Sequence, residues 1–160
     1  MKNIIIVDMQ KGFINNMNKH LVNKIDDYLK TNQFDNIFFT KCINNQQSPF
    51  VKILNWNGVS TEVEQEFAVQ IPQGAQILTK NCYGLSNEHM QQLKKLKIKE
   101  IEICGTDTDA CCMAIAFDLF DCNIKPIILS DLCASSSSDL NIHNNALEIM
   151  KRQFGKDNIK

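Results

Sequence analysis

Short runs of β-branched and aromatic residues alternate along this chain with amphipathic segments, and this alternation constrains the fold more than any other feature. The runs expected to form strands cover residues 3–7, 36–41, 76–80, 100–105 and 125–130. The segments expected to form helices cover residues 18–30, 86–98, 108–123 and 140–154. Strands that alternate with helices predict βαβ units and a parallel sheet covered on both faces. We therefore expect an α/β fold of three layers, α/β/α, with a mostly parallel sheet of five or six strands.

The chain is expected to form one domain over residues 1–160. A length of 160 residues suits a single domain with a core of its own. Residues 42–75 are polar and interrupted by proline and glycine, and we predict only one short helix there, within "STEVEQEFA" (60–68). The sequence shows no internal repeat and no linker long enough to divide the chain.

Charge and cysteine usage exclude several classes of protein. The net charge of −1 predicts no binding of nucleic acid or of an anionic membrane. No apolar run approaches the roughly 20 residues of a membrane span, and "MKNIIIVDMQ" lacks the features of a signal peptide. The seven cysteines include no CxxC pair and no zinc-like spacing. We expect a reduced, cytoplasmic protein.

Three reactive residue types fall at the ends of predicted strands. Asp8 follows the first strand, Lys80 ends the third, and Cys111 with Cys112 opens the helix after the fourth. In an open parallel sheet, ligands bind outside the carboxyl ends of the strands. Each residue also has a structural interpretation, as a strand cap, a surface lysine or a small core residue. Their shared edge favours the functional interpretation.

A thiol at this edge could act as a nucleophile. Only the thiolate attacks well, and a helix N-terminus together with Lys80 would lower the pKa of the thiol. A carboxylate can take its proton, and free N–H groups of the first helical turn can hold an oxyanion. With Thr108 as the N-cap, Cys111 falls at the third helical position, and Cys112 packs inward beside Ala116.

Along most of its length the chain resembles the isochorismatase-like cysteine hydrolases. The stretch "IIIVDMQKGF" is similar to the opening strand and "DxQxxF" pattern of that family, and "IPQGAQILTKNCYG" to its lysine segment. The stretch "ICGTDTDACCMAIAFD" resembles its "GxxTDxCV" elbow, and "ILSDLCASSSSDLNIHNNAL" its closing strand, loop and helix. Three ordered motifs are far more specific than one. The resemblance implies an isochorismatase-like, Rossmann-like fold.

The resemblance also implies roles for the residues that match the motifs. Cys111 would be the nucleophile, Asp8 the general base and then acid, and Lys80 the charge that tunes both. It further implies a non-proline cis peptide between Thr106 and Asp107, with the amides of Asp107 and Cys111 as the oxyanion hole.

The sequence departs from the family in two places. Metal-binding members carry an Asp/His cluster after the second strand, where this chain reads "FFTKCINNQQSPF". We therefore expect no bound metal and no other cofactor. The second departure is Asp107, where the family more often has a small apolar residue. A carboxylate that faced the oxyanion hole in its ionised form would oppose catalysis.

Aromatic residues are candidates for the substrate pocket. Phe13, Trp56 and Tyr83 are expected to bind substrate, because aromatic walls with a few polar groups are typical of ligand sites. Phe50 and Trp56 fit ordinary core or interface packing equally well. The three histidines, His20, His89 and His143, are interpreted as residues of helix surfaces or helix starts.

These observations favour a cysteine hydrolase that cleaves a C–N bond of a small amide through a thioester, as a homo-oligomer, either dimer or tetramer. One alternative is a catalytically weak or inactive member of the same fold that binds a small molecule. A flavodoxin-like nucleotide module is disfavoured, because "DMQKGF" has a single glycine. A thiol-redox role for Cys111 and Cys112 has no CxxC motif to support it.

Overall fold

The computed structural model describes residues 2–160 and contains one sheet of five strands. These are β1 (Asn3–Val7), β2 (Asn36–Cys42), β3 (Gln76–Lys80), β4 (Glu100–Thr106) and β5 (Lys125–Ala134). All neighbours pair in parallel, in the order β3-β2-β1-β4-β5. The expected parallel α/β fold is confirmed, and the sheet is parallel throughout.

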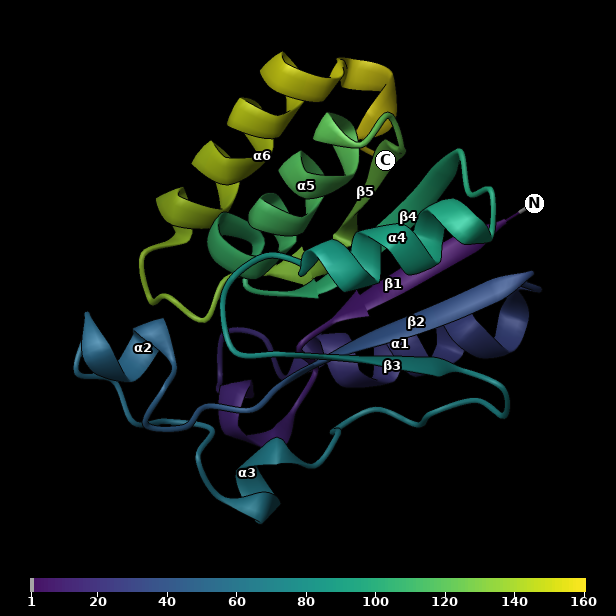
Figure 1. Ribbon diagram of the computed structural model, residues 1–160. Helices are drawn as coiled ribbons and strands as arrows, with labels where there is room; N and C mark the ends of the chain where they lie inside the picture. Colours follow the sequence, from purple (N-terminus) through teal and green to yellow (C-terminus); the bar gives the residue numbers. More distant parts are fainter. Residues whose placement is uncertain (1) are drawn as a thin grey trace.

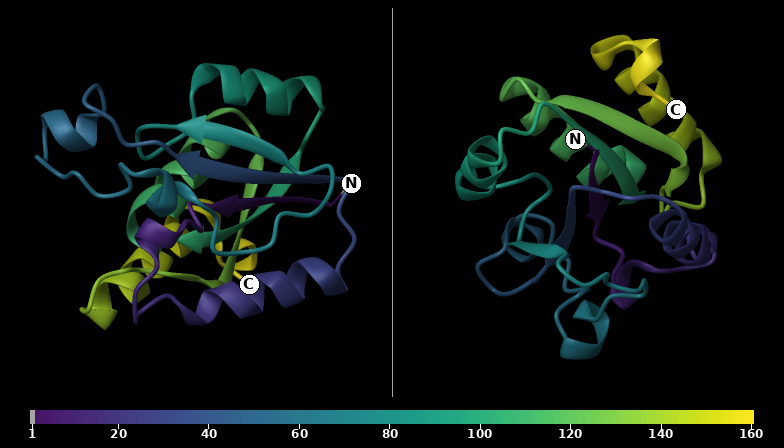
Figure 2. Two further views of the ribbon diagram at one scale, coloured as in Figure 1. Left: turned by 90° about the horizontal axis from the view of Figure 1, so that it is seen from below. Right: turned by 90° about the vertical axis from the view of Figure 1, so that its right-hand side faces the viewer.

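Helices cover both faces of the sheet (Figures 1 and 2). On one face lie α4 (Asn87–Lys95), α5 (Met113–Asp121) and α6 (Leu140–Phe154), and on the other lies α1 (His20–Thr31). Successive residues of a strand point to opposite faces, so β1 serves both layers. Ile5 and Val7 pack toward α4, α5 and α6, whereas Ile4 and Ile6 pack toward α1.

The predicted elements are found at or near their expected positions. Ser86 caps α4 as predicted, and its side chain accepts a hydrogen bond from the backbone N–H of His89 at 3.3 Å. The helix predicted over residues 18–30 begins at His20, and the strand predicted over residues 125–130 continues to Ala134. The helix predicted over residues 108–123 is divided into a π-helical turn, Thr108–Cys112, and α5.

Residues 43–75 connect β2 to β3: the first part lies beyond the carboxyl ends of the strands, and the rest runs back to the start of β3 (Figure 1). The predicted short helix is α3 (Glu62–Gln65), which begins with a capping box between Thr61 and Glu64. A second short helix, α2 (Pro49–Lys52), was not predicted, although Ser48 as N-cap and Pro49 at the first position are ordinary helix-start signals.

No helix within residues 2–160 is both long enough and apolar enough to cross a membrane.

Buried thiols make the stability of this fold sensitive to alkaline pH. Burial raises the pKa of Cys42 to about 12, and it raises the pKa values of Cys104, Cys111 and Cys112 well above the ordinary value. The unfolded chain would release these protons near pH 8.5, while the folded chain retains them. Above that pH the free energy of unfolding should therefore fall, by up to about 1.4 kcal/mol per pH unit for each thiol.

Urea denaturation at pH 7.0, 8.5 and 9.5 under reducing conditions measures this slope. Cys104→Ala, which removes one of the four thiols, should show a shallower dependence on pH than the unmodified chain. A free energy of unfolding that stays constant from pH 7.5 to 9.5 would contradict the expectation.

Candidate active site

Asp8, Lys80 and Cys111 meet at the carboxyl edge of the sheet. Lys80 Nζ lies 2.7 Å from Asp8 Oδ2 and 3.4 Å from Cys111 Sγ. The side chains of Asp8 and Lys80 are each only 1% exposed. Because β2 lies between β1 and β3, the long lysine side chain has to pass the end of β2 to reach Asp8. The structure therefore brings together the three side chains that sequence analysis selected.

Thr40 of β2 is a functional candidate that sequence analysis missed. Its hydroxyl donates a hydrogen bond to Asp8 Oδ1 at 2.6 Å and accepts one from the backbone N–H of Asp8 at 2.9 Å. These two bonds hold the carboxylate while Lys80 pairs with its other oxygen. The signal available in the sequence was a polar residue within the apolar run "NIFFTK". In the structure this residue is fully buried.

Cys111 lies one position further along its helix than predicted. The π-helical turn begins after Asp107, so Thr108 is its first residue and not its N-cap. The backbone N–H of Cys112 bonds to the carbonyl of Asp107 at 3.0 Å, which spans five residues and adds one residue to the turn. Cys112 is fully buried and packs in the same core cluster as Ala116, as expected.

Charge and burial set the protonation of the site. Burial lowers the pKa of Lys80, but the neighbouring Asp8 carboxylate and Cys111 more than compensate, so the pKa is raised and Lys80 stays a cation. Burial and then Asp8 raise the pKa of Cys111, and Lys80 offsets this only in part. This direction is opposite to the sequence-based expectation. Asp8 already neutralises Lys80, so a thiolate would be an uncompensated charge in a buried place.

The backbone turns sharply where β4 ends. The peptide bond between Thr106 and Asp107 is cis, at the position that the family resemblance implies. Gly105 comes before it with a φ of +120°, and a Cβ there would lie 2.2 Å from the carbonyl oxygen of Val7. No side chain fits at this close approach of β4 to β1. The backbone amides of Asp107 and Cys111, which the family resemblance implies as the oxyanion hole, come directly after this turn in the sequence.

The Asp107 carboxylate is hydrogen-bonded to two neighbouring residues. Both oxygens accept hydrogen bonds from Ser136, in the loop after β5, and Oδ1 accepts another from Thr106. These three hydrogen bonds fix the orientation of the carboxylate.

The predicted pocket aromatics form one continuous series. Phe13 stacks on Trp56 with ring centroids 5.9 Å apart. Phe50 contacts Trp56 at 5.7 Å and Tyr83 at 4.9 Å, both edge to face. Phe50 is buried, whereas Tyr83 is exposed. The three predicted substrate-binding residues thus belong to one cluster of aromatic rings, in which Phe50 links Trp56 and Tyr83.

The histidines have different surroundings. His20 begins α1, and His89 completes the capping box of α4, which agrees with their interpretation as helix-start residues. His143 is half-buried in α6, and its Nδ1 lies 2.9 Å from the hydroxyl oxygen of Thr108. It supports the turn that carries Cys111 and is not simply a surface residue.

The segment after β2, residues 43–61, contains no His, Cys, Asp or Glu. Ser48 and Asn44 are buried polar residues there. The amide oxygen of Asn44 has no hydrogen-bond partner among the described residues, whereas its amide nitrogen donates to the carbonyls of Trp56 and Gly58 at 3.0 and 2.8 Å. It serves to close the loop. Within residues 2–160 no three side chains of His, Cys, Asp or Glu are grouped so that they could hold a metal.

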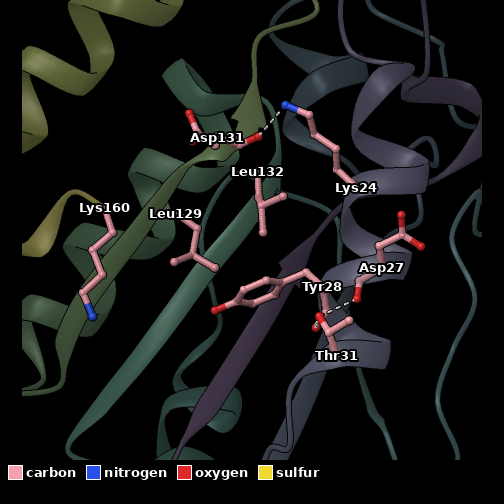
Figure 3. Close-up of a pocket in the computed structure, with 8 residues that line it drawn as sticks. All are labelled: Lys24, Asp27, Tyr28, Thr31, Leu129, Asp131, Leu132 and Lys160. Carbon is pink, nitrogen blue, oxygen red and sulfur yellow. Dashed lines mark hydrogen bonds between the residues drawn. The ribbon is translucent and has the colours of Figure 1, made fainter.

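A separate groove lies between α1 and β5 (Figure 3). It has a volume of about 470 Å³, and Tyr28, Leu129 and Leu132 form its apolar part. Lys24 donates to the carbonyl of Asp131 at 3.5 Å across it. None of Asp8, Lys80 and Cys111 lines this groove, so it is distinct from the candidate active site.

Comparison with known proteins agrees with this geometry. The isochorismatase domain matches residues 2–156, nearly the whole chain. The chain belongs to the isochorismatase family. Family membership confirms the resemblance seen in the motifs. Isochorismatase domain-containing protein 2 of Bos taurus is 30% identical over 66 residues, which cover 41% of this chain and 32% of that protein.

Solved structures of this family share the fold. An isochorismatase-like hydrolase from Alkaliphilus metalliredigens superposes with a TM-score of 0.83 at 16% identity, covering 96% of this chain and 92% of that one. The pyrazinamidase of Pyrococcus horikoshii, solved in complex with zinc, has a TM-score of 0.81 at 21% identity, covering 99% and 97%. The N-carbamoylsarcosine amidase of Thermoplasma acidophilum has a TM-score of 0.81 at 19% identity, covering 97% and 94%.

Proposed function

We propose that this family member is a cysteine hydrolase that cleaves the C–N bond of a small amide through a thioester. The observation that carries the proposal is the buried contact of Lys80 Nζ with both Asp8 Oδ2 and Cys111 Sγ, at 2.7 and 3.4 Å. A nucleophile, a base and a fixed positive charge within contact distance are the groups that covalent acyl transfer needs.

Because the pKa of Cys111 is raised, the proposed reaction needs Asp8 as a base. The thiol carries its proton at rest, so a base has to remove the proton as Sγ attacks the carbonyl carbon. Asp8 takes this proton and then gives it to the departing nitrogen, which leaves as ammonia or an amine. The backbone N–H groups of Asp107 and Cys111 hold the oxyanion of the tetrahedral intermediate.

The second half of the reaction reuses the same groups. Asp8, again ionised, accepts a proton from water as the water oxygen attacks the thioester carbonyl. The tetrahedral intermediate collapses, Sγ leaves with a proton returned by Asp8, and a carboxylic acid is released. Throughout, Lys80 remains charged, because its pKa is raised by the neighbouring Asp8 and Cys111.

The substrate is expected to be an acyclic or carbamoyl-type amide and not nicotinamide. An ion that binds a ring nitrogen would orient an aromatic amide, and within residues 2–160 no three side chains of His, Cys, Asp or Glu are grouped to hold such an ion. A structural neighbour named as an N-carbamoylsarcosine amidase is consistent with a carbamoyl-type substrate.

Ammonia release from a panel of small amides, before and after treatment with a chelator, tests this function. Acyclic and carbamoyl amides should be hydrolysed faster than nicotinamide, and the chelator should leave the rates unaltered. Rapid quenching followed by intact-mass measurement should reveal the acyl group on the protein. Loss of activity to the chelator with recovery on adding zinc, iron or manganese would contradict the metal-free expectation, and no hydrolysis of any amide would contradict the function.

A further inference from the structure

Within residues 2–160, the Asp107 carboxylate accepts hydrogen bonds from two residues, Thr106 and Ser136. Oδ1 accepts from the backbone N–H of Ser136 at 2.7 Å and from the Thr106 hydroxyl at 2.5 Å. Oδ2 accepts from the Ser136 hydroxyl at 2.7 Å. Ser136 thus donates a hydrogen bond to each carboxylate oxygen. Hydrogen bonds to a charged acceptor are about twice as strong as those between neutral groups.

The loop that contains Ser136 is also hydrogen-bonded to the segment between β1 and α1. Asn15, which lies between β1 and α1, donates its side-chain amide to the carbonyl of Ser136 at 2.8 Å. Asn18, fully buried, donates to the Thr106 hydroxyl oxygen at 3.0 Å. Residues far apart in the sequence are therefore joined around Asp107.

Asp107 also carries a backbone N–H that the proposed reaction uses. This N–H precedes the π-helical turn of Cys111 and is one of the two proposed oxyanion donors. A donor of this kind acts only if it points at the place where negative charge develops. The side chain of the same residue is the part that the loop holds, so the loop contact sets the direction of the N–H.

We propose that Asp107 is a positioning residue whose carboxylate, clamped by Ser136, fixes the oxyanion-binding N–H beside Cys111. The inference rests on the proposed function for its meaning. A small apolar residue at this position could not accept hydrogen bonds from Ser136. In this chain, hydrogen bonds between the Asp107 carboxylate and Ser136 therefore hold the backbone in place. An apolar residue at this position would have to be held by packing.

A reversible aldehyde adduct measures the oxyanion site without requiring amide hydrolysis. Cys111 Sγ adds to the aldehyde carbon, and the thiol proton ends on the former carbonyl oxygen, giving a hemithioacetal with nothing released. The adduct oxygen occupies the oxyanion position, and the adduct protects Cys111 from iodoacetamide. The probe is propionaldehyde, and the readout is the concentration that halves the alkylation rate of Cys111, followed by intact mass.

The variants are Asp107→Ala, Asp107→Asn, Ser136→Ala and the double variant Asp107→Ala/Ser136→Ala. The half-protecting concentration should rise about tenfold or more in Asp107→Ala and Ser136→Ala, because a misdirected donor loses much of its value. The half-protecting concentration of the double variant should be no higher than that of Asp107→Ala alone, because both changes remove the same contact. Asp107→Asn keeps an acceptor oxygen and a similar size, should fold, and should show a smaller rise.

Controls separate this inference from the proposed function. The alkylation rate without aldehyde should stay the same in all variants, because Asp8 and Lys80 are unchanged. Ser138→Ala, an exposed serine of the same loop, should match the unmodified chain in both measurements. Protection that is equal in all variants, effects that add in the double variant, or no protection of the unmodified chain would each overturn the inference. Failure to hydrolyse amides, with the protection pattern as expected, would overturn only the function.

Discussion

Cys111→Ala should abolish amide hydrolysis while the protein remains folded. Loss of Sγ removes the atom that forms the thioester, so we expect kcat to fall at least about a thousandfold. Cys111 lies at the margin of a core cluster, and alanine fills most of its volume, so the free energy of unfolding should change little. Ammonia release measures activity, and urea denaturation measures stability.

The neighbouring cysteine provides the matched control. Cys112→Ala removes a fully buried thiol from the same cluster and should cost about 1 kcal/mol of stability. Its kcat should stay within a few-fold of the unmodified value, because Cys112 packs toward the core and not toward Lys80. Equal loss of activity in both folded variants would undo the assignment of Cys111 as the nucleophile.

Removing the charge of Asp8 or of Lys80 should move the reactivity of Cys111 in opposite directions. In Asp8→Asn, Lys80 loses its partner, so the thiolate of Cys111 becomes the anion that pairs with it and the pKa of Cys111 falls. In Lys80→Met, the Asp8 carboxylate remains beside the thiol and the pKa of Cys111 rises further. At pH 7.5 we expect alkylation at least about tenfold faster in Asp8→Asn and at least about tenfold slower in Lys80→Met.

The rate of iodoacetamide labelling of Cys111, measured by intact mass from pH 6 to 10, gives both values. Hydrolysis should be lost in both variants, because Asp8→Asn has a reactive thiolate but no base or acid for the departing nitrogen. Breaking a buried ion pair costs roughly 3–5 kcal/mol, so folding is checked by urea denaturation at each pH. A shift of the alkylation profile in the same direction in both variants would contradict the charge arrangement described here.

The sequence was sufficient to predict the strands and the edge where the chemistry lies. The run "NIIIV" coincides with β1, because a strand buried on both faces is apolar at nearly every position. The run "QILTK" coincides with β3, an edge strand in which only Leu78 and Lys80 are buried. Asp8, Lys80 and Cys111 could be placed together because all strand ends of a parallel sheet meet at one edge. That argument needs only the direction of the strands.

Features that depend on side-chain contacts could not be predicted. Thr40 is polar like many strand residues, and only the pairing of β2 with β1 shows that its hydroxyl reaches Asp8. The extra residue in the turn before α5 shifted Cys111, because helical spacing alone does not reveal a π-turn. The pKa of Cys111 was predicted with the wrong sign, since burial and the prior pairing of Lys80 with Asp8 are not visible in a sequence.

Because Lys80 lies on β3, the Cys111 thiol has its charged neighbours only when the sheet is assembled. Asp8, Lys80 and Cys111 are far apart in the sequence, and their contact requires β3, β2, β1 and β4 to be paired in register. A shift of β3 by one residue would turn Lys80 to the opposite face. A partly assembled chain therefore has an ordinary thiol with neither its cation nor its base. The contact on which the proposed mechanism depends therefore requires all four strands to be paired.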